Sequence, residues 1–396
     1  MGDDIFSNPI KSYKNFNMGT EIDIAGIFIY NGIKELDSME SLYYESEVFS
    51  FLYPISVGIE RLQKVLIVLG ENISEEEVEE FEKSLITHSH QDLQNRIKKH
   101  VDIKFNAKQN SFLQVLNNFY KNCRYERFNV RGRYNLEKRI LIDYIKNNLS
   151  NKTIDEYWLD NEIKEFLGRI IGSIARNYYD NIYKLASNQN LYTYELRSGS
   201  KAGKIFLSQL KKNSLQEQVV NEQISLKEFL VFLINTTNGN NFYKFIKEIE
   251  PLEFDIALAN SYLESICKGN IPSELVSEVE YLYSESGYSK DRIEMINCIG
   301  NDRVDFDFIA TIKLKEELEL LISKEHSCEK FVCEFCQIIN DVENEEVSEV
   351  LEDILKMCDK FKKGDYDTKI KQEKFIDSVK VIYENFTEAF FNFESE

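Results

Sequence analysis

The pattern of apolar and polar positions predicts helices along almost the whole chain. From Glu21 to Leu36, apolar side chains recur at steps of three and four residues, which is the period of one helical face. A second helix is predicted over residues 41–69, and its stretch ISVGIERLQKVLIVLG is apolar nearly all round, as in a buried central helix. We expect Pro54 to bend or split it. The other predicted helices are 74–86, 89–100, 111–121, 136–149, 160–187, 201–213, 312–341, 346–361 and 368–391, and the segments 225–237, 252–268 and 272–286 also have amphipathic helical patterns with acidic outer faces.

Composition supports an all-α fold. The 396 residues include only 4 prolines and 16 glycines, the residue types that helix interiors avoid. One segment, DRVDFDFIAT (302–311), alternates between polar and apolar positions in the manner of a short strand.

Charge divides the chain into three parts. Residues 1–100 hold 9 basic and 18 acidic side chains, residues 101–212 hold 20 and 11, and residues 213–396 hold 19 and 39. The net charge of −20 therefore hides a basic middle between two acidic flanks. We predict an arm over 1–19, a helical domain with a basic middle over 20–212, and an acidic α-helical domain over 213–396.

The chain carries no pattern of secretion or membrane insertion. Its seven cysteines are odd in number and lack the spacing of a disulfide framework. The start, MGDDIFSNPI, has neither a basic region nor an apolar run, and no stretch reaches about 18 uninterrupted apolar residues. A cytoplasmic location without membrane contact is the expectation.

Three of the four histidines lie in THSHQDLQNRIKKH, residues 87–100. On a helix, Asp92, Arg96 and His100 follow at four-residue steps along one face, and His88 and His90 lie near its start. An arginine can stabilise charge on a phosphorane while a histidine transfers a proton, which is the chemistry of metal-independent RNA cleavage. The alternative is a solvated helix face with an Asp92–Arg96 ion pair.

The preceding helix adds three charges to this picture. Glu60, Arg61 and Lys64 interrupt an otherwise apolar run, and a buried helix cannot hold unpaired charges cheaply. We expect partners from the histidine stretch. The alternative is an ordinary Glu60–Lys64 pair on a partly exposed helix.

The order of these features resembles HEPN domains, the helical bundles of prokaryotic toxins and antiphage defence proteins. The resemblance rests on EIDIAGIFIYNGI, then YPISVGIERLQKVLIVLG, a short acidic helix and HSHQDLQNRI, and it covers roughly residues 20–150. It implies an all-α bundle, frequent dimerisation and metal-independent RNase activity. The family's Arg–His signature has wider spacing than Arg96 and His100, which leave three residues between them, and this departure favours a non-catalytic member.

The segment CRYERFNVRGRYNLEKR (123–139) is the densest basic region. Its cations alternate with aromatic rings, so phosphates and splayed bases are the expected ligands. The alternatives are pairing with flanking acids and docking of the acidic C-terminal domain. The candidate nucleic-acid-binding residues are Arg124, Tyr125, Arg127, Arg131, Arg133, Tyr134, Lys138 and Arg139.

Two further motifs are weaker. RSGSKAGKIF (197–206) lacks the glycine spacing of a phosphate-binding loop. The spacing of His326, Cys328, Cys333 and Cys336 would suit zinc, but the stretch reads as one continuous helix without a turn between the ligands. We therefore predict no metal and no cofactor.

Two functions follow from the sequence. The first is a nucleic-acid-targeting effector of a bacterial defence or toxin system that cleaves RNA with Arg96, His100 and His88 or His90, supported by Glu60, Arg61, Lys64 and Asp92. The second is a non-catalytic interaction or sensor protein that binds a nucleotide, a phage protein or a partner subunit, with the acidic C-terminal domain as a contact surface. A homodimer is compatible with both.

Overall fold

The computed structural model describes residues 5–6, 8–131, 135–149, 154–207, 215–236, 241–286, 290–301, 304, 306–339, 342, 345–366 and 368–390. Within these ranges the protein is all-α and contains no strand. The chain forms two compact units, Met1–Leu230 with Glu264–Asn270, and Val231–Leu263 with Ile271–Glu396. The boundary predicted near residue 213 lies outside the described residues.

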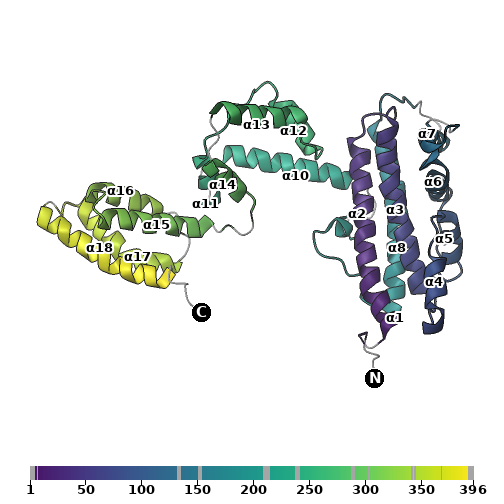
Figure 1. The fold of residues 1–396 in the computed structure, drawn as a ribbon, viewed down its shortest axis with the longest axis horizontal. Coiled ribbons are helices and arrows are strands. Elements are labelled where there is room, and N and C mark those ends of the chain that lie inside the picture. The colour runs from purple at the N-terminus through teal and green to yellow at the C-terminus, as the bar shows by residue number, and fades with distance from the viewer. Residues whose placement is uncertain are drawn as a thin grey trace. The chain divides into compact units, whose positions relative to one another are not determined.

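Three long helices build the first unit: α2 (Met18–Ser38), α3 (Glu45–Gly70) and α8 (Asn161–Asn188). They lie side by side, and α3 contacts both of the others (Figure 1). Gly58 permits this approach, because a Cβ there would lie 2.9 Å from the Ala25 carbonyl oxygen on α2. The apolar run of α3 is buried, as its pattern predicted.

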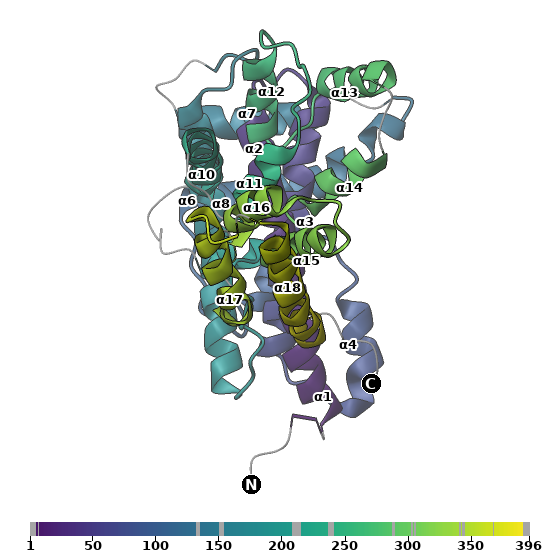
Figure 2. The ribbon, with the colours of Figure 1, turned by 90° about the vertical axis from the view of Figure 1, so that its left-hand side faces the viewer.

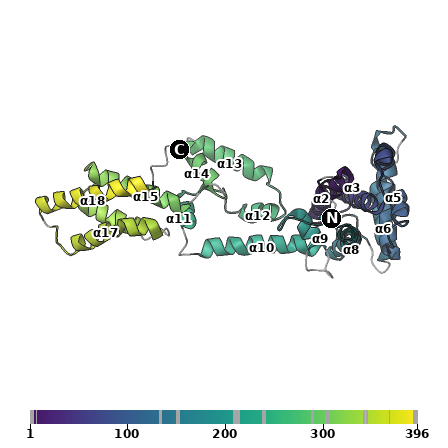
Figure 3. The ribbon, with the colours of Figure 1, turned by 90° about the horizontal axis from the view of Figure 1, so that it is seen from below.

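Shorter helices form a second layer against α3 and α8. Figure 3 shows α5 and α6 beside the three long helices. Ser89 begins α5, because its hydroxyl accepts a hydrogen bond from the Asp92 N–H at 3.3 Å. The members of this layer are α4 (Val78–Ser84), α5 (His90–Ile97), α6 (Ala107–Asn118) and α7 (Leu136–Asn148), and α9 (Lys201–Phe206) packs on α2.

Helix α10 (Leu215–Asn235) begins in the first unit and ends in the second. The core of the second unit is apolar and comes from α15 to α18, of which α17 and α18 run side by side (Figure 2). Its helices are α11 (Asn241–Glu248), α12 (Ala259–Cys267), α13 (Ser273–Ser286), α14 (Lys290–Cys298), α15 (Phe306–Ile322), α16 (Cys328–Ile339), α17 (Glu345–Lys362) and α18 (Lys369–Phe390).

Pro54 does not split α3. The helix runs through it, because the burial of both flanking segments outweighs the missing backbone N–H, a loss of about 3 kcal/mol. Residues 9–17, which we expected to be an arm, are also helical, as α1 (Pro9–Ser12) and a π-helical turn (Tyr13–Asn17). Asn8 caps this segment by accepting the Lys11 N–H at 2.9 Å.

Two predictions about the second unit were wrong. Residues 312–341 are not one helix, because Lys324 adopts a left-handed backbone conformation that ends α15 before α16 begins. The segment 302–311 is not a strand where the structure describes it. Helix α15 begins at Phe306, so the alternating pattern there continues into a helical apolar face.

Candidate binding pocket

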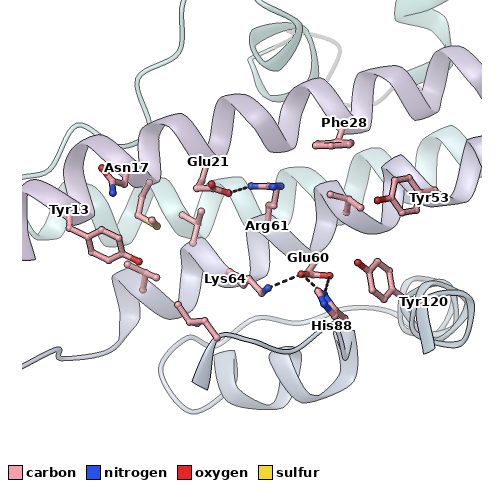
Figure 4. A pocket seen from close by; sticks show the side chains of 15 residues that line it. Tyr13, Asn17, Glu21, Phe28, Tyr53, Glu60, Arg61, Lys64, His88 and Tyr120 are labelled. Carbon is pink, nitrogen blue, oxygen red and sulfur yellow. Dashed lines mark hydrogen bonds and ion pairs between the residues drawn. The ribbon is translucent and has the colours of Figure 1, made fainter. Parts of the chain in front are cut away.

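A pocket of about 540 Å³ opens in the first unit between α2, α3 and the connection that leads into α5. Figure 4 shows its polar side chains converging from these elements. We call it the Glu60 pocket. Its lining includes Tyr13, Glu21 and Phe28, then Tyr53, Glu60, Arg61 and Lys64 of α3, and finally His88 and Tyr120.

Glu60 is the buried centre of this pocket. Its carboxylate accepts from the Lys64 Nζ at 2.7 Å and lies 3.1 and 3.2 Å from the His88 Nδ1. A carboxylate only accepts hydrogen bonds, so the His88 Nδ1 carries the hydrogen and its Nε2 is the basic nitrogen of the neutral ring. The His88 side chain is 54% exposed, so Glu60 orients an imidazole that solvent can reach.

Aromatic rings border His88. Its ring centroid lies 4.7 Å from that of Tyr120, which belongs to a π-helical turn (Phe119–Cys123). Burial raises the pKa of the Tyr120 hydroxyl, and the negative charge of Glu60 raises it further. Arg124 lies 4.7 to 5.1 Å from the ring centroids of Tyr53, Tyr120 and Tyr125, and it donates to the Tyr120 hydroxyl at 2.5 Å.

Arg61 has its partner on another helix. Its guanidinium pairs with Glu21 of α2 and lies 5.8 Å from the centre of the Phe28 ring (Figure 4). Of the three charges that interrupt the apolar run of α3, Glu60 therefore contacts the histidine stretch, and Arg61 contacts α2. Lys64 pairs with Glu60 along its own helix, as the alternative interpretation had it.

Arg96 and His100 lie at a different carboxylate, that of Glu71. Arg96 donates to it twice, through Nε at 2.7 Å and Nη2 at 2.6 Å, and to the Ser84 hydroxyl at 2.9 Å. The His100 Nε2 lies 3.3 Å from the same carboxylate. The hydrogen bonds from Arg96 hold the pKa of Glu71 below its usual range. The described lining of the Glu60 pocket includes His88 but not Arg96 or His100.

His90 is a core residue, 1% exposed. The Ser56 hydroxyl lies 2.8 Å from its Nε2, and its Nδ1 lies 2.9 Å from the Gln63 Oε1. Gln63 in turn donates to the hydroxyl of Tyr178 at 2.9 Å, and Tyr178 donates to the Gln94 Oε1. Burial lowers the pKa of His90 to about 4, so the ring is neutral near pH 7.

Asp92 does not pair with Arg96. Its carboxylate lies 3.9 Å from the Lys121 Nζ, and both side chains are about half exposed or more. Surface pairs of this kind contribute at most about 1 kcal/mol. The Asp92–Arg96 pair that we considered from the sequence is absent because Glu71 engages Arg96 from outside the helix.

The basic segment is partly neutralised by acids of neighbouring elements. Arg127 pairs with Glu45 at 3.0 Å and with Glu137, and Lys138 pairs with Glu156 at 2.6 Å. Arg131 and Arg139 are exposed, and no ion pair of the described part involves them. Arg133 and Tyr134 lie outside the described residues. The cations thus divide into paired ones, exposed ones and Arg124, which aromatic rings surround.

The described residues contain no group of three or more histidine, cysteine, aspartate or glutamate side chains that could hold a metal ion. His326 lies 3.0 Å from the Glu317 carboxylate and 2.7 Å from the Lys330 Nζ. Cys328 is buried at the start of α16, whereas Cys333 is exposed. These residues therefore do not converge on one point. No helix in the described part is long and apolar enough to cross a membrane.

Sequence reasoning missed Glu71, Glu21 and Tyr120, which complete both clusters. Glu71 carried a signal: an acid directly after the end of a long helix is unfavourable next to the negative end of the helix dipole, so a cationic partner is expected. Glu21 and Tyr120 have no such signal, because their contacts depend on how the helices pack.

Together, the fold and the site define a helical protein with an open polar pocket in its N-terminal unit. No known family model, curated protein or solved structure matches this chain.

Proposed function

We propose that this protein binds RNA and that the Glu60 pocket holds one nucleotide of it. The observation that carries the proposal is the oriented imidazole of His88, which Glu60 fixes at Nδ1 and Tyr120 flanks. Rings of this kind can stack on bases, a contact worth about 1–3 kcal/mol per base.

The size and charge of the pocket fit the same ligand. Its volume of about 540 Å³ lies within the range of small-molecule sites. Arg61 and Lys64 line it, and each also pairs with a carboxylate, so a phosphate would compete with Glu21 and Glu60. Binding should therefore weaken as salt rises. The exposed Arg131 and Arg139 would contact the backbone of a longer strand.

The test is fluorescence anisotropy of a labelled single-stranded RNA with His88→Ala and Arg61→Ala. We expect each variant to lose about tenfold in affinity, since each removes one contact of roughly 1–3 kcal/mol. His100→Ala is the matched control, because it removes a histidine bound to Glu71 outside the pocket. Equal affinity of wild type, His88→Ala and Arg61→Ala would refute the proposal.

RNA cleavage is the second candidate, and the Glu60–His88 pair favours it. With Nδ1 held by the carboxylate, the His88 Nε2 can take a proton from a 2′-hydroxyl or return one to the leaving oxygen. The pair would act without metal. Arg96 and His100, which the sequence suggested for this role, are engaged by Glu71.

Incubation with total RNA in EDTA separates the two candidates. If His88 transfers the proton, His88→Ala and Glu60→Gln lower the cleavage rate by about 10²–10⁴-fold, and Arg96→Ala and His100→Ala do not. If the wild-type protein binds RNA and does not cleave it, the cleavage candidate is rejected and RNA binding alone is supported. The role in bacterial defence that the HEPN resemblance implies remains a prediction.

A further inference from the structure

A second, smaller cavity lies between α5 and α6, and carboxamide side chains line it on both sides. Its volume is about 300 Å³. Gln91, Gln94 and Asn95 lie on one helix, and Asn110, Gln114 and Asn117 lie on the other. Lys98 is the one lysine or arginine in the described lining, and no carboxylate is present there. We call this cavity the amide groove.

The hydrogen-bond relay behind the groove fixes the direction of Gln94. The Gln63 Nε2 donates to the backbone carbonyl of His90 at 3.1 Å, and a carbonyl can only accept. The nitrogen of Gln63 therefore also faces Tyr178 and donates to its hydroxyl. Tyr178 then gives its own hydrogen to the Gln94 Oε1, which leaves the Gln94 Nε2 as the end of the relay.

The end of this relay has no partner. Gln94 is only 6% exposed, and its Nε2 makes no hydrogen bond within the described residues. A buried donor without an acceptor costs about 1–3 kcal/mol. Across the groove, Asn110 uses its Nδ2 on the backbone carbonyls of Phe105 and Asn106, at 2.9 and 3.0 Å, so its oxygen remains an acceptor. The exposed carboxamides of Gln91 and Asn95 on α5 and of Gln114 on α6 each carry a donor and an acceptor, so the groove offers both from opposite walls.

This pattern suits an uncharged, flat ring with both donors and acceptors on its edge. Carboxamides pair with such edges through two parallel hydrogen bonds, as asparagine and glutamine do with bases in nucleic-acid complexes. A volume of about 300 Å³ is at the lower end of small-molecule sites, which suits a single ring system rather than a peptide segment.

The amide groove and the Glu60 pocket are lined by residues that are close together in the sequence. His88 and Tyr120 line the Glu60 pocket. His90 and Asn117 line the amide groove. His88 and His90 are two positions apart, and Asn117 and Tyr120 are three positions apart. Both sites therefore use residues around the start of α5 and the end of α6.

We propose that the amide groove is a nucleobase subsite, in which hydrogen bonds to the base edge discriminate among the bases of a bound RNA. As a subsite for RNA, it rests on the proposed function. The groove itself can be tested with single nucleotides.

The experiment compares Asn95→Ala and Gln114→Ala, one from each wall, with Asn118→Ala. All three side chains are exposed carboxamides, and Asn118 lies on α6 outside the groove lining. Titration of the four nucleoside monophosphates is followed by NMR, and affinity for the four short homopolymer RNAs by anisotropy. We expect one base to be preferred, and the preference to fall roughly five- to thirtyfold in the two groove variants but not in Asn118→Ala.

The outcomes separate this inference from the proposed function. If His88→Ala weakens RNA binding while Asn95→Ala and Gln114→Ala leave the base preference unchanged, the subsite is refuted and the function stands. If the wild-type protein binds no RNA but a monophosphate binds and is lost in the groove variants, the function fails and the subsite stands. The subsite is refuted if the protein binds all four homopolymers with equal affinity and binds none of the four monophosphates.

Discussion

His88 and His90 are two residues apart, and their surroundings are opposite. His88 is 54% exposed at the Glu60 pocket, with a carboxylate on one nitrogen and a tyrosine ring beside it. His90 is 1% exposed, and neutral groups bind both of its nitrogens. Ser89 begins α5 between them, so one side chain belongs to the connection and the other to the helix face that packs on α3.

The clusters around the carboxylates of Glu60 and Glu71 differ in the same way, although they contain similar residue types. Each receives one histidine and one cation: His88 and Lys64, or His100 and Arg96. The Glu71 cluster is closed, because Arg96 binds through two parallel hydrogen bonds and lies 5.4 Å from the Phe81 ring. Matching residue types therefore form an open pocket in one place and a structural contact in the other.

The largest expected effect is on His90. His90→Ala should lower the free energy of unfolding by about 4 kcal/mol, because it leaves a cavity and removes the partners of Ser56 and Gln63 in the core. His88→Ala should change it by less than about 1 kcal/mol. Urea unfolding followed by circular dichroism measures both. Similar losses for the two variants would contradict the division into a core and a pocket histidine.

The next effect is a dependence on pH. Because burial lowers the pKa of His90 from 6.5 to about 4, the unfolded chain binds a proton in this range that the folded chain does not. The stability that His90 contributes is complete above pH 6.5 and is lost as pH falls toward 4, by about 3 kcal/mol. Carboxylates such as Glu71 also stabilise the protein less as pH falls. The wild-type protein is therefore compared with His90→Gln, whose free energy of unfolding should fall less steeply with decreasing pH. Parallel curves would contradict the neutral buried ring.

A smaller effect is expected at Glu71. Arg96→Ala should lower the free energy of unfolding by about 2 kcal/mol, because it removes two charge-assisted hydrogen bonds from a mostly buried carboxylate. Lys64→Ala should cost less, about 1 kcal/mol, since it removes one hydrogen bond and Glu60 keeps His88. RNA affinity should respond the other way, falling in Lys64→Ala and not in Arg96→Ala. A loss of RNA affinity in Arg96→Ala would place the Glu71 cluster in the binding site.

The smallest effect on stability concerns the exposed cations. Arg131→Ala should leave the free energy of unfolding within about 0.5 kcal/mol of wild type. The slope of the logarithm of RNA affinity against the logarithm of salt concentration should decrease in magnitude by about one. Lys138→Ala is the comparison, because its ammonium is buried and pairs with Glu156. It should reduce stability and leave the salt dependence unchanged. An unchanged salt slope in Arg131→Ala would show that this arginine does not contact the strand.

The helices could be predicted because their information is local. The seven-residue steps of Ile22, Ile29 and Leu36, about two helical turns each, place them on one face, and all three are fully buried. The break at Lys324 could not be predicted, because a non-glycine residue in the left-handed region leaves no pattern in the sequence. Continuity through Pro54 depended on the burial of the whole of α3.

The candidate site was predictable only in part. The sequence indicated that Glu60, Arg61 and Lys64 need partners and that the histidine stretch would supply one, and His88 does so. It also grouped Arg96 and His100 together, and they do share a carboxylate, but that carboxylate is Glu71 and not one of the predicted set.

The amino-acid sequence by itself determined the helical class, the buried course of α3 and the gathering of histidines before and within α5. The tertiary structure decided which histidine is exposed, which is buried and which carboxylate each charge meets. The physical reason is range. Helix formation depends on neighbours within about one turn, whereas His88 and Glu60 are 28 positions apart and Arg96 and Glu71 are 25 apart, so only the packing of the helices brings them within hydrogen-bond distance.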